Sequence, residues 1–172
     1  MLSLPAADEF GGHFGTYIAL VADRDVLGQL EENRRDTTAL FAALTDEQAN
    51  FRYAPDKWSL KELLGHLADT ERVMSYRMLR IARGDTTPLP GFDQDSYIAN
   101  ADFSGVSMPQ LLADYEAVRA ATLSLTRSIA PEAWLRKGTA SNATMSARAF
   151  AYVIAGHELH HLNIVRDRYL RA

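Results

Sequence analysis

Hydrophobic residues recur every three or four positions over four long segments of the chain. This spacing predicts helices that each bury one face. The first segment follows Asp23 or Asp25, either of which can cap a helix, and it is expected to end near Leu44. Its predicted buried stripe comprises Val26, Leu30, Asn33, Thr37, Leu40 and Leu44.

The second predicted helix has a clear start and stop. Ser59 and Glu62 form an S-x-x-E capping box, in which each side chain satisfies a free backbone N–H group of the first turn. The helix is expected to run to about Arg83, with Gly84 as its stop. Its predicted buried stripe comprises Leu60, Leu63, Leu64, Leu67, Met74, Met78 and Ile81.

Two further helices follow from the same signals. Ser107, Pro109 and Gln110 open the third, and Pro131 is expected to end it. Ser146 is expected to cap a fourth helix that continues nearly to the C-terminus. The buried stripe of the third helix is predicted to comprise Leu111, Tyr115, Val118, Thr122, Leu125 and Ile129.

The pattern favours an all-α fold, a four-helix bundle that forms a single domain over residues 1–172. No segment alternates between apolar and polar residues as a half-buried strand does, and residues 136–144 are expected to form a polar loop. Residues 84–106 connect helices two and three and are much longer than the roughly 2 to 8 residues of most bundle loops. Such a connection can cross the bundle from end to end, which predicts up-down-down-up topology.

The long crossover also carries candidate site residues. Residues 88–92 are expected to cover one side of the bundle. Four polar or aromatic residues follow, and they are placed to line a site: Asp93, Gln94, Asp95 and Tyr97.

Charge and composition argue against nucleic-acid and membrane partners, although a local basic run keeps DNA binding open as an alternative. The chain has 18 basic and 22 acidic residues, a formal net charge of -4, which is not the basic surface that nucleic acid requires. The local basic run of Arg166, Arg168 and Arg171 suits the end of a helix. Residues 1–9 lack the basic and apolar regions of a secretory signal, and no stretch approaches the roughly 20 apolar residues of a membrane span. We therefore expect a cytoplasmic protein with a small-molecule partner.

Cysteine is absent, so any metal ion must be held by nitrogen or oxygen atoms. The chain has five histidines, of which three lie close together near the C-terminal end. They are His13, His66, His157, His160 and His161.

Helical geometry separates these histidines. At about 100° per residue, His157 and His161 share the predicted apolar stripe of the fourth helix with Phe150, Val153, Ile154 and Ile164, whereas Leu159 and Leu162 point elsewhere. Imidazoles at positions i and i+4 can bind one divalent ion together. His66, on the second helix, is the available third ligand. Three neutral ligands leave positions open for substrate, which is typical of a catalytic metal site. His160 falls at the margin of the stripe, and His160 and His13 are expected to be exposed or supporting residues.

Residues 157–161 also match H-E-x-x-H, the signature of zinc proteases. In that family the helix ends soon afterwards so that a downstream residue can return as third ligand. Here Ile164 stands where one version has glycine, Asp167 points away from His157, and no glycine or proline follows His161. A protease is therefore disfavoured.

Three segments resemble the DinB/YfiT-like superfamily of metal-binding four-helix bundles. They are K-W-S-L-K-E-L-L-G-H-L-A-D-T-E-R at 57–72, T-P-L-P-G-F-D at 87–93 and Y-V-I-A-G-H-E-L-H-H-L at 152–162. The resemblance implies a divalent metal, with zinc, nickel or iron as candidates, held by His66, His157 and His161. It also implies a homodimer, and it transfers no thiol-binding residue.

Relatives in that family transfer low-molecular-weight thiols such as bacillithiol, glutathione or mycothiol to electrophiles. The leading hypothesis is therefore a metal-dependent thiol S-transferase acting in stress or detoxification, whose sulfur must arrive with a diffusible co-substrate. A metal-dependent hydrolase and a non-catalytic metal- or ligand-binding stress protein remain alternatives. Glu158 and Asp69 lie within two turns of the predicted ligands, where they can orient imidazoles, relay protons or serve as ordinary surface acids.

Overall fold

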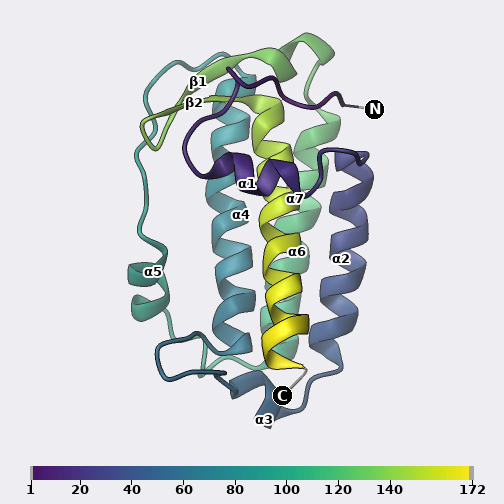
Figure 1. Cartoon of the computed structure of the whole chain (residues 1–172), viewed down its shortest axis with the longest axis vertical. Helices are drawn as coiled ribbons and strands as arrows, with labels where there is room; N and C mark the ends of the chain where they lie inside the picture. Colours follow the sequence, from purple (N-terminus) through teal and green to yellow (C-terminus); the bar gives the residue numbers. More distant parts are fainter. Residues whose placement is uncertain (1, 171–172) are drawn as a thin grey trace.

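Four long helices lie side by side in the computed structural model, which describes residues 2–170 (Figure 1). They are α2 (Val26–Ala42), α4 (Leu60–Ala82), α6 (Met108–Arg127) and α7 (Ala147–Ile164). The predicted all-α class and four-helix bundle are confirmed.

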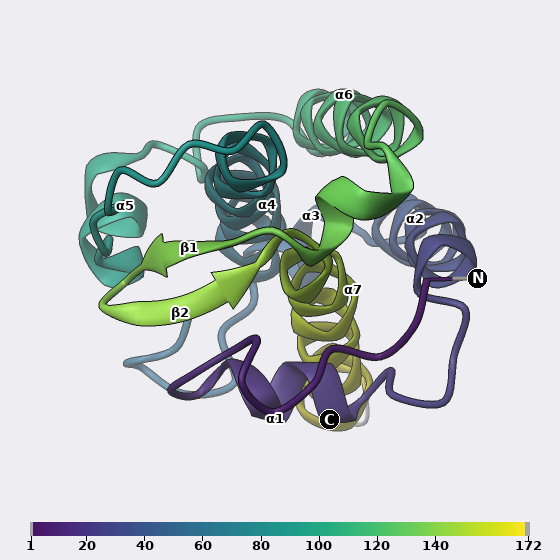
Figure 2. The same ribbon diagram turned by 90° about the horizontal axis from the view of Figure 1, so that it is seen from above.

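The chain runs down α2, up α4, up α6 and down α7 in the view of Figure 1. Seen from above in Figure 2, α4 and α2 each lie between α6 and α7, and α4 packs against both of these helices, as α2 does. The crossover from α4 to α6 spans the length of the bundle. The predicted up-down-down-up topology is therefore confirmed.

The predicted caps of α4 are present. Ser59 Oγ accepts a hydrogen bond from the N–H of Glu62 at 3.3 Å, and the Glu62 carboxylate accepts one from the N–H of Ser59 at 2.7 Å. Gly84 has a φ of 84°, the left-handed conformation that ends helices and that glycine adopts without strain. Asp25, rather than Asp23, stands at the N-cap of α2.

The boundaries of α6 and α7 differ slightly from expectation. α6 ends at Arg127, before the predicted stop at Pro131, which instead begins the 3₁₀ helix η1 (Pro131–Leu135). Ser146 caps α7 as predicted, accepting a hydrogen bond from the N–H of Ala149 at 3.1 Å. A π-helical turn, η2 (Val165–Tyr169), continues α7.

Three short helices lie outside the four predicted ones. They are α1 (Phe14–Ala19), α3 (Asp46–Asn50) and α5 (Gln94–Asn100). Local capping accounts for two of them: Thr45 and Gln48 form a capping box at α3, and Asp93 accepts a hydrogen bond from the N–H of Asp95 at 3.1 Å at the start of α5. Periodicity cannot reveal helices of five to seven residues, because they contain fewer than two full turns.

The expectation of a polar loop at residues 136–144 is wrong. β1 (Lys137–Ala140) and β2 (Ala143–Ser146) form an antiparallel hairpin, with Lys137 opposite Ser146. Ser141 and Asn142 make its two-residue turn, and both have positive φ, as a type I′ turn requires. The strands were missed because each has only four residues, and most of these are small or polar.

α7 is buried on nearly every side, contrary to the prediction of one stripe. Leu162, expected to point away from the core, is fully buried. Leu162 packs in the apolar cluster that contains Phe41 and Leu64. Further towards the N-terminal end of α7, α1 crosses the face that α4 and α2 leave open (Figures 1 and 2). At Gly156 a Cβ atom would lie 2.0 Å from the carbonyl oxygen of Tyr17, so only glycine permits this approach.

The bundle core consists of two apolar clusters. One surrounds Phe150 near the hairpin, and the other surrounds Leu64 near α3. Buried polar residues of all four long helices lie between them, and this layer contains the candidate site. No described helix has both the length and the apolar character that a membrane span requires.

Candidate metal centre

Three histidine side chains converge in the polar layer. Nε2 of His157 lies 3.0 Å from Nε2 of His66 and 3.1 Å from Nε2 of His161. One nitrogen of each ring falls within 4.8 Å of the others, so the three residues form a group that could hold a metal ion. The three histidines selected from the sequence are therefore brought together by the fold.

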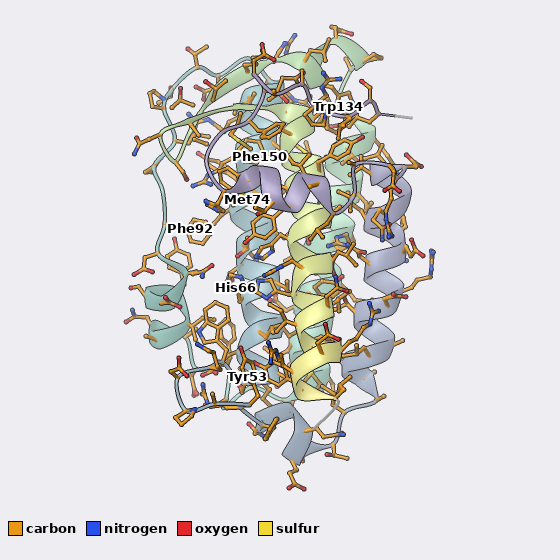
Figure 3. The ribbon with its side chains drawn as sticks, in the orientation of Figure 1. Tyr53, His66, Met74, Phe92, Trp134 and Phe150 are labelled. Atoms are coloured by element: carbon orange, nitrogen blue, oxygen red, sulfur yellow. The ribbon has the colours of Figure 1, made fainter. Side chains whose placement is uncertain are left out.

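The helices explain this convergence. His157 and His161 lie one turn apart on α7, and the antiparallel α4 presents His66 opposite them, at mid-height in the bundle (Figure 3). His66 and His157 are buried, with 3% and 6% of their surfaces exposed, while His161 is half-buried.

Burial keeps the three imidazoles uncharged. It lowers the pKa of His66 to about 4 and that of His161 to about 3. At His161 the neighbouring histidines lower the pKa further. Desolvation lowers the pKa of His157 well below its ordinary value. At neutral pH the site therefore presents unprotonated nitrogens, the form that binds metal ions.

This donor set fits a divalent cation. A tetrahedral ion with bonds of 2.0 to 2.1 Å separates its ligand atoms by about 3.3 Å, close to the two spacings observed here. Each neutral imidazole carries one N–H proton, so hydrogen bonds among the three rings cannot satisfy the lone pair of every ring. A cation at the centre of the cluster would bind all three lone pairs. Imidazole ligands suit zinc, nickel and iron alike.

Three neighbours of the site were not singled out from the sequence. Thr70, one turn after His66, places its hydroxyl 3.4 Å from His66 Nδ1. The Trp58 ring lies 4.6 Å from the His66 ring, and the Tyr17 ring meets His157 edge-on at 5.2 Å. Spacing along α4 could have indicated Thr70, but only the fold brings Tyr17 to α7.

Glu158 and Asp69 take no part in the histidine cluster. Glu158 is buried, and its carboxylate accepts hydrogen bonds from Thr37, Tyr115 and Arg119. Asp69 is partly exposed and pairs with Arg72 at 3.2 Å. Neither carboxylate forms a hydrogen bond to a site histidine within residues 2–170. The commitment of Glu158 to other partners also removes the base that an H-E-x-x-H protease would need.

The two remaining histidines lie outside the cluster. His160 is partly exposed, and its ring lies 5.6 Å from that of Tyr17. His13 is exposed on the segment before α1. These positions agree with the expectation of exposed or supporting residues.

Two cavities reach the histidine cluster from different sides. The His157 cavity, of about 400 Å³, extends from His157 towards Arg77 and Phe92. The His161 cavity, of about 370 Å³, extends from His161 towards Trp58 and Lys57. Asp95 of α5 lines both of them. Both volumes lie in the range of small-molecule sites, about 300 to 1,000 Å³.

Most of the crossover residues expected at a site do lie there. Asp93, Gln94 and Asp95 line the His157 cavity. Tyr97 does not; it is exposed and packs against the Phe92 ring at 5.3 Å. The turn of α5 between Asp95 and Tyr97 directs the two side chains differently.

One arginine of the basic run near the C-terminus forms an ion pair within the bundle. Arg166 pairs with Asp36 at 3.0 Å, and Arg171 lies outside the described residues.

Comparison with known proteins places this geometry in a family. Residues 29–165 match the model of the DinB superfamily. A protein of Oceanobacillus iheyensis named "Putative metal-dependent hydrolase" is 27% identical over 124 residues, which are 70% of this chain and 69% of that protein. The structure of YfiT from Bacillus subtilis, described as a probable metal-dependent hydrolase with an unusual four-helix bundle topology, superposes with a TM-score of 0.70. That comparison covers 97% of this chain and 91% of YfiT at 15% identity, so it supports the fold alone. Because the family match extends over most of the bundle, the chain belongs to the DinB superfamily.

Proposed function

We propose that this protein is a divalent-metal-dependent transferase that joins low-molecular-weight thiols, such as bacillithiol, to small electrophiles. The observation that carries this proposal is the pair of cavities that end on the same histidine cluster, one at His157 and the other at His161. Two cavities allow two organic molecules to reach one centre from separate sides, whereas hydrolysis has only one organic substrate to admit beside water.

The reaction requires no protein nucleophile, in keeping with a chain that lacks cysteine. A divalent ion held by His66, His157 and His161 would supply the positive charge that lowers the pKa of a thiol bound beside it. The thiol loses its S–H proton to solvent, the sulfur bonds to the electrophilic carbon, and the bond from that carbon to the leaving group breaks, so that the leaving group departs with the electron pair, as chloride does from 1-chloro-2,4-dinitrobenzene.

The protein's own residues would prepare the site for this reaction. Burial keeps the histidines neutral, so protons do not compete with a cation at pH 7. Thr70 is placed to hold the His66 ring in one orientation, as the outer hydrogen bonds of metal-binding histidines do. The rings of Tyr17 and Trp58 flank the cluster and limit access by water.

A thiol-transfer assay tests the proposal. Protein loaded in turn with zinc, nickel or iron is mixed with bacillithiol or glutathione and 1-chloro-2,4-dinitrobenzene, and product formation is followed by absorbance. We expect metal-dependent turnover that His66→Ala abolishes and that His160→Ala, a control on the same face of the bundle, retains. Equal turnover by wild type and His66→Ala would contradict the proposal.

A metal-dependent hydrolase is the second candidate, and the names of the two relatives favour it. A metal ion can acidify bound water to a pKa near 7. Against it stands the position of Glu158, whose carboxylate already accepts three hydrogen bonds and is not free to act as a base. Ester or amide cleavage without any thiol would support the hydrolase. Tight metal binding without turnover in either assay would instead indicate a binding protein.

The homodimer and the absence of a nucleic-acid partner stay predictions.

A further inference from the structure

Arg77 is a buried arginine that forms no ion pair with any acidic residue in the described part of the chain. Only 2% of its surface is exposed, and it lies on α4, three turns beyond His66. Its guanidinium donates hydrogen bonds to the carbonyl oxygen of Pro90 at 2.6 Å and to the sulfur of Met74 at 3.6 Å, and it lies 5.6 Å from the centre of the Phe92 ring. No carboxylate of residues 2–170 forms an ion pair with it.

Arg119, another buried arginine of the bundle, has the acidic partners that Arg77 lacks within residues 2–170. Arg119 is fully buried and forms ion pairs with Glu71 at 2.7 Å and Glu158 at 2.5 Å. Burying a charge is costly unless a charge of opposite sign compensates it. Arg77 is buried without such a compensating charge among the described residues. Its guanidinium has five N–H donors in a planar fork, so it can donate further hydrogen bonds to a ligand.

Arg77 also lines the His157 cavity, so its charge faces the space in which a small molecule can bind. Thr70, Met74 and Arg77 follow His66 at helical spacing and form one wall of this cavity. Phe92 reaches the cavity from the crossover, opposite α4 (Figure 3). The cavity thus has a cation at one end and a histidine of the cluster at the other.

We propose that Arg77 binds the carboxylate of an elongated substrate whose reacting group lies at the histidine cluster. This inference rests on the proposed function, because it assigns a substrate class to the same site. Asp93 and Asp95 line the cavity and are exposed, so they would repel a doubly charged phosphate more strongly than a singly charged carboxylate. His66 and Arg77 are eleven residues apart on α4, which corresponds to a rise of about 16 Å along the helix. The arginine side chain reaches part of the way back towards His66. A substrate that spans the two residues would therefore have roughly 10 Å between its carboxylate and its reacting group.

A pair of probes of the same shape tests this site. Binding of 4-phenylbutyrate and of its uncharged amide is measured by titration calorimetry, on zinc-loaded protein and again after chelation of the metal. We expect the carboxylate to bind at least about tenfold more tightly than the amide in both forms, because a charged hydrogen bond to a guanidinium is lost in the amide. If the preference for the carboxylate over the amide is lost after the metal is chelated, the proposal is overturned, since the carboxylate would then be binding the metal ion and not Arg77.

Variants identify the residue responsible. Arg77→Met is expected to abolish the preference for the carboxylate, and Arg77→Lys to retain part of it, because lysine keeps the charge but loses the fork. Asp95→Asn should strengthen binding of the carboxylate and leave binding of the amide unchanged. An unaltered preference in Arg77→Met would refute the assignment.

Arg77 also anchors the crossover through Pro90, so Arg77→Met can fail to fold. In that case NMR of the wild-type protein decides. The Nε–H resonance, identified by its loss in Arg77→Lys, is expected to shift on addition of 4-phenylbutyrate but not of the amide, and a resonance that does not respond would overturn the proposal.

The two proposals can fail separately. Carboxylate binding at Arg77 without thiol transfer would refute the transferase and leave the binding site standing. Thiol transfer without any preference for carboxylates would refute the binding site alone.

Discussion

Glu158, the residue after His157, forms a buried ion pair with Arg119 at 2.5 Å in the centre of the bundle. The same guanidinium pairs with Glu71 of α4 and donates to the carbonyl oxygen of Leu30 in α2 at 2.6 Å. One arginine of α6 therefore connects all four long helices. This network fixes α7 at the position from which His157 faces His66.

Removal of Arg119 is expected to destabilise the protein strongly. Arg119→Met leaves two buried carboxylates without a counter-charge, and breaking a buried ion pair in this way costs about 3 to 5 kcal/mol. The matched control is Arg127→Met, which removes an exposed arginine of the same helix from a 3.4 Å pair with Glu31 and should cost under about 1 kcal/mol. Urea denaturation measures both, and similar losses in the two variants would contradict the role of the network.

Gly156→Ala is expected to displace α1 from α7. The added methyl group would lie 2.0 Å from the carbonyl oxygen of Tyr17, an atom of the backbone that cannot move alone. Overpacking of this kind typically costs about 1 to 3 kcal/mol. Metal affinity should fall as well, because Tyr17 packs on His157.

The control for this variant is Gly91→Ala, where the nearest atom is an ordinary 3.7 Å away. Thermal melting and zinc titration should show a change only for Gly156→Ala. Wild-type stability in that variant would mean that α1 does not press on α7.

The histidine cluster predicts how metal should affect stability. Zinc at one hundred times its dissociation constant is expected to stabilise the wild-type protein by about 2.7 kcal/mol relative to protein with chelator. His157→Ala should lose this gain, and its purified form should contain little metal. His160→Ala should behave as wild type. Equal metal content of His157→Ala and wild type, measured by elemental analysis, would refute the site.

Acid should weaken the attachment of the N-terminal segment. Glu9 is buried, and hydrogen bonds from Arg148 lower the pKa of its carboxyl from 4.5 to about 2. The stabilisation is therefore complete above pH 4.5 and is lost as the pH falls towards 2, where the folded state also takes up the proton. A shift of this size corresponds to about 3 kcal/mol.

Glu9→Gln is the test of that dependence. The variant should be less stable than wild type at pH 7, and the difference should narrow as the pH falls from 4.5 towards 2. Free energies of unfolding from urea denaturation across this range measure the difference, and a gap that stays constant with pH would contradict the assignment to Glu9.

Local signals in the sequence determined much of the fold. The capping box of Ser59 and Glu62, the positive φ at Gly84 and the cap at Ser146 involve residues within four positions of one another. The spacing of His157 and His161 is an equally local signal, because side chains at positions i and i+4 lie next to each other on any α-helix. These features could be predicted because the helix itself sets their geometry.

The tertiary structure alone decided which side chains are available for chemistry. Thr37 donates to Glu158 across 121 residues of sequence, and this contact helps to turn an apparent protease base into a structural residue. The approach of Tyr17 to Gly156, and the pairing of Arg77 with the carbonyl oxygen of Pro90 rather than with a carboxylate of residues 2–170, depend likewise on the tertiary structure. Periodicity records which face of a helix is buried but not what lies opposite it. The identity of that partner determines whether a buried charge is compensated or left to bind a ligand.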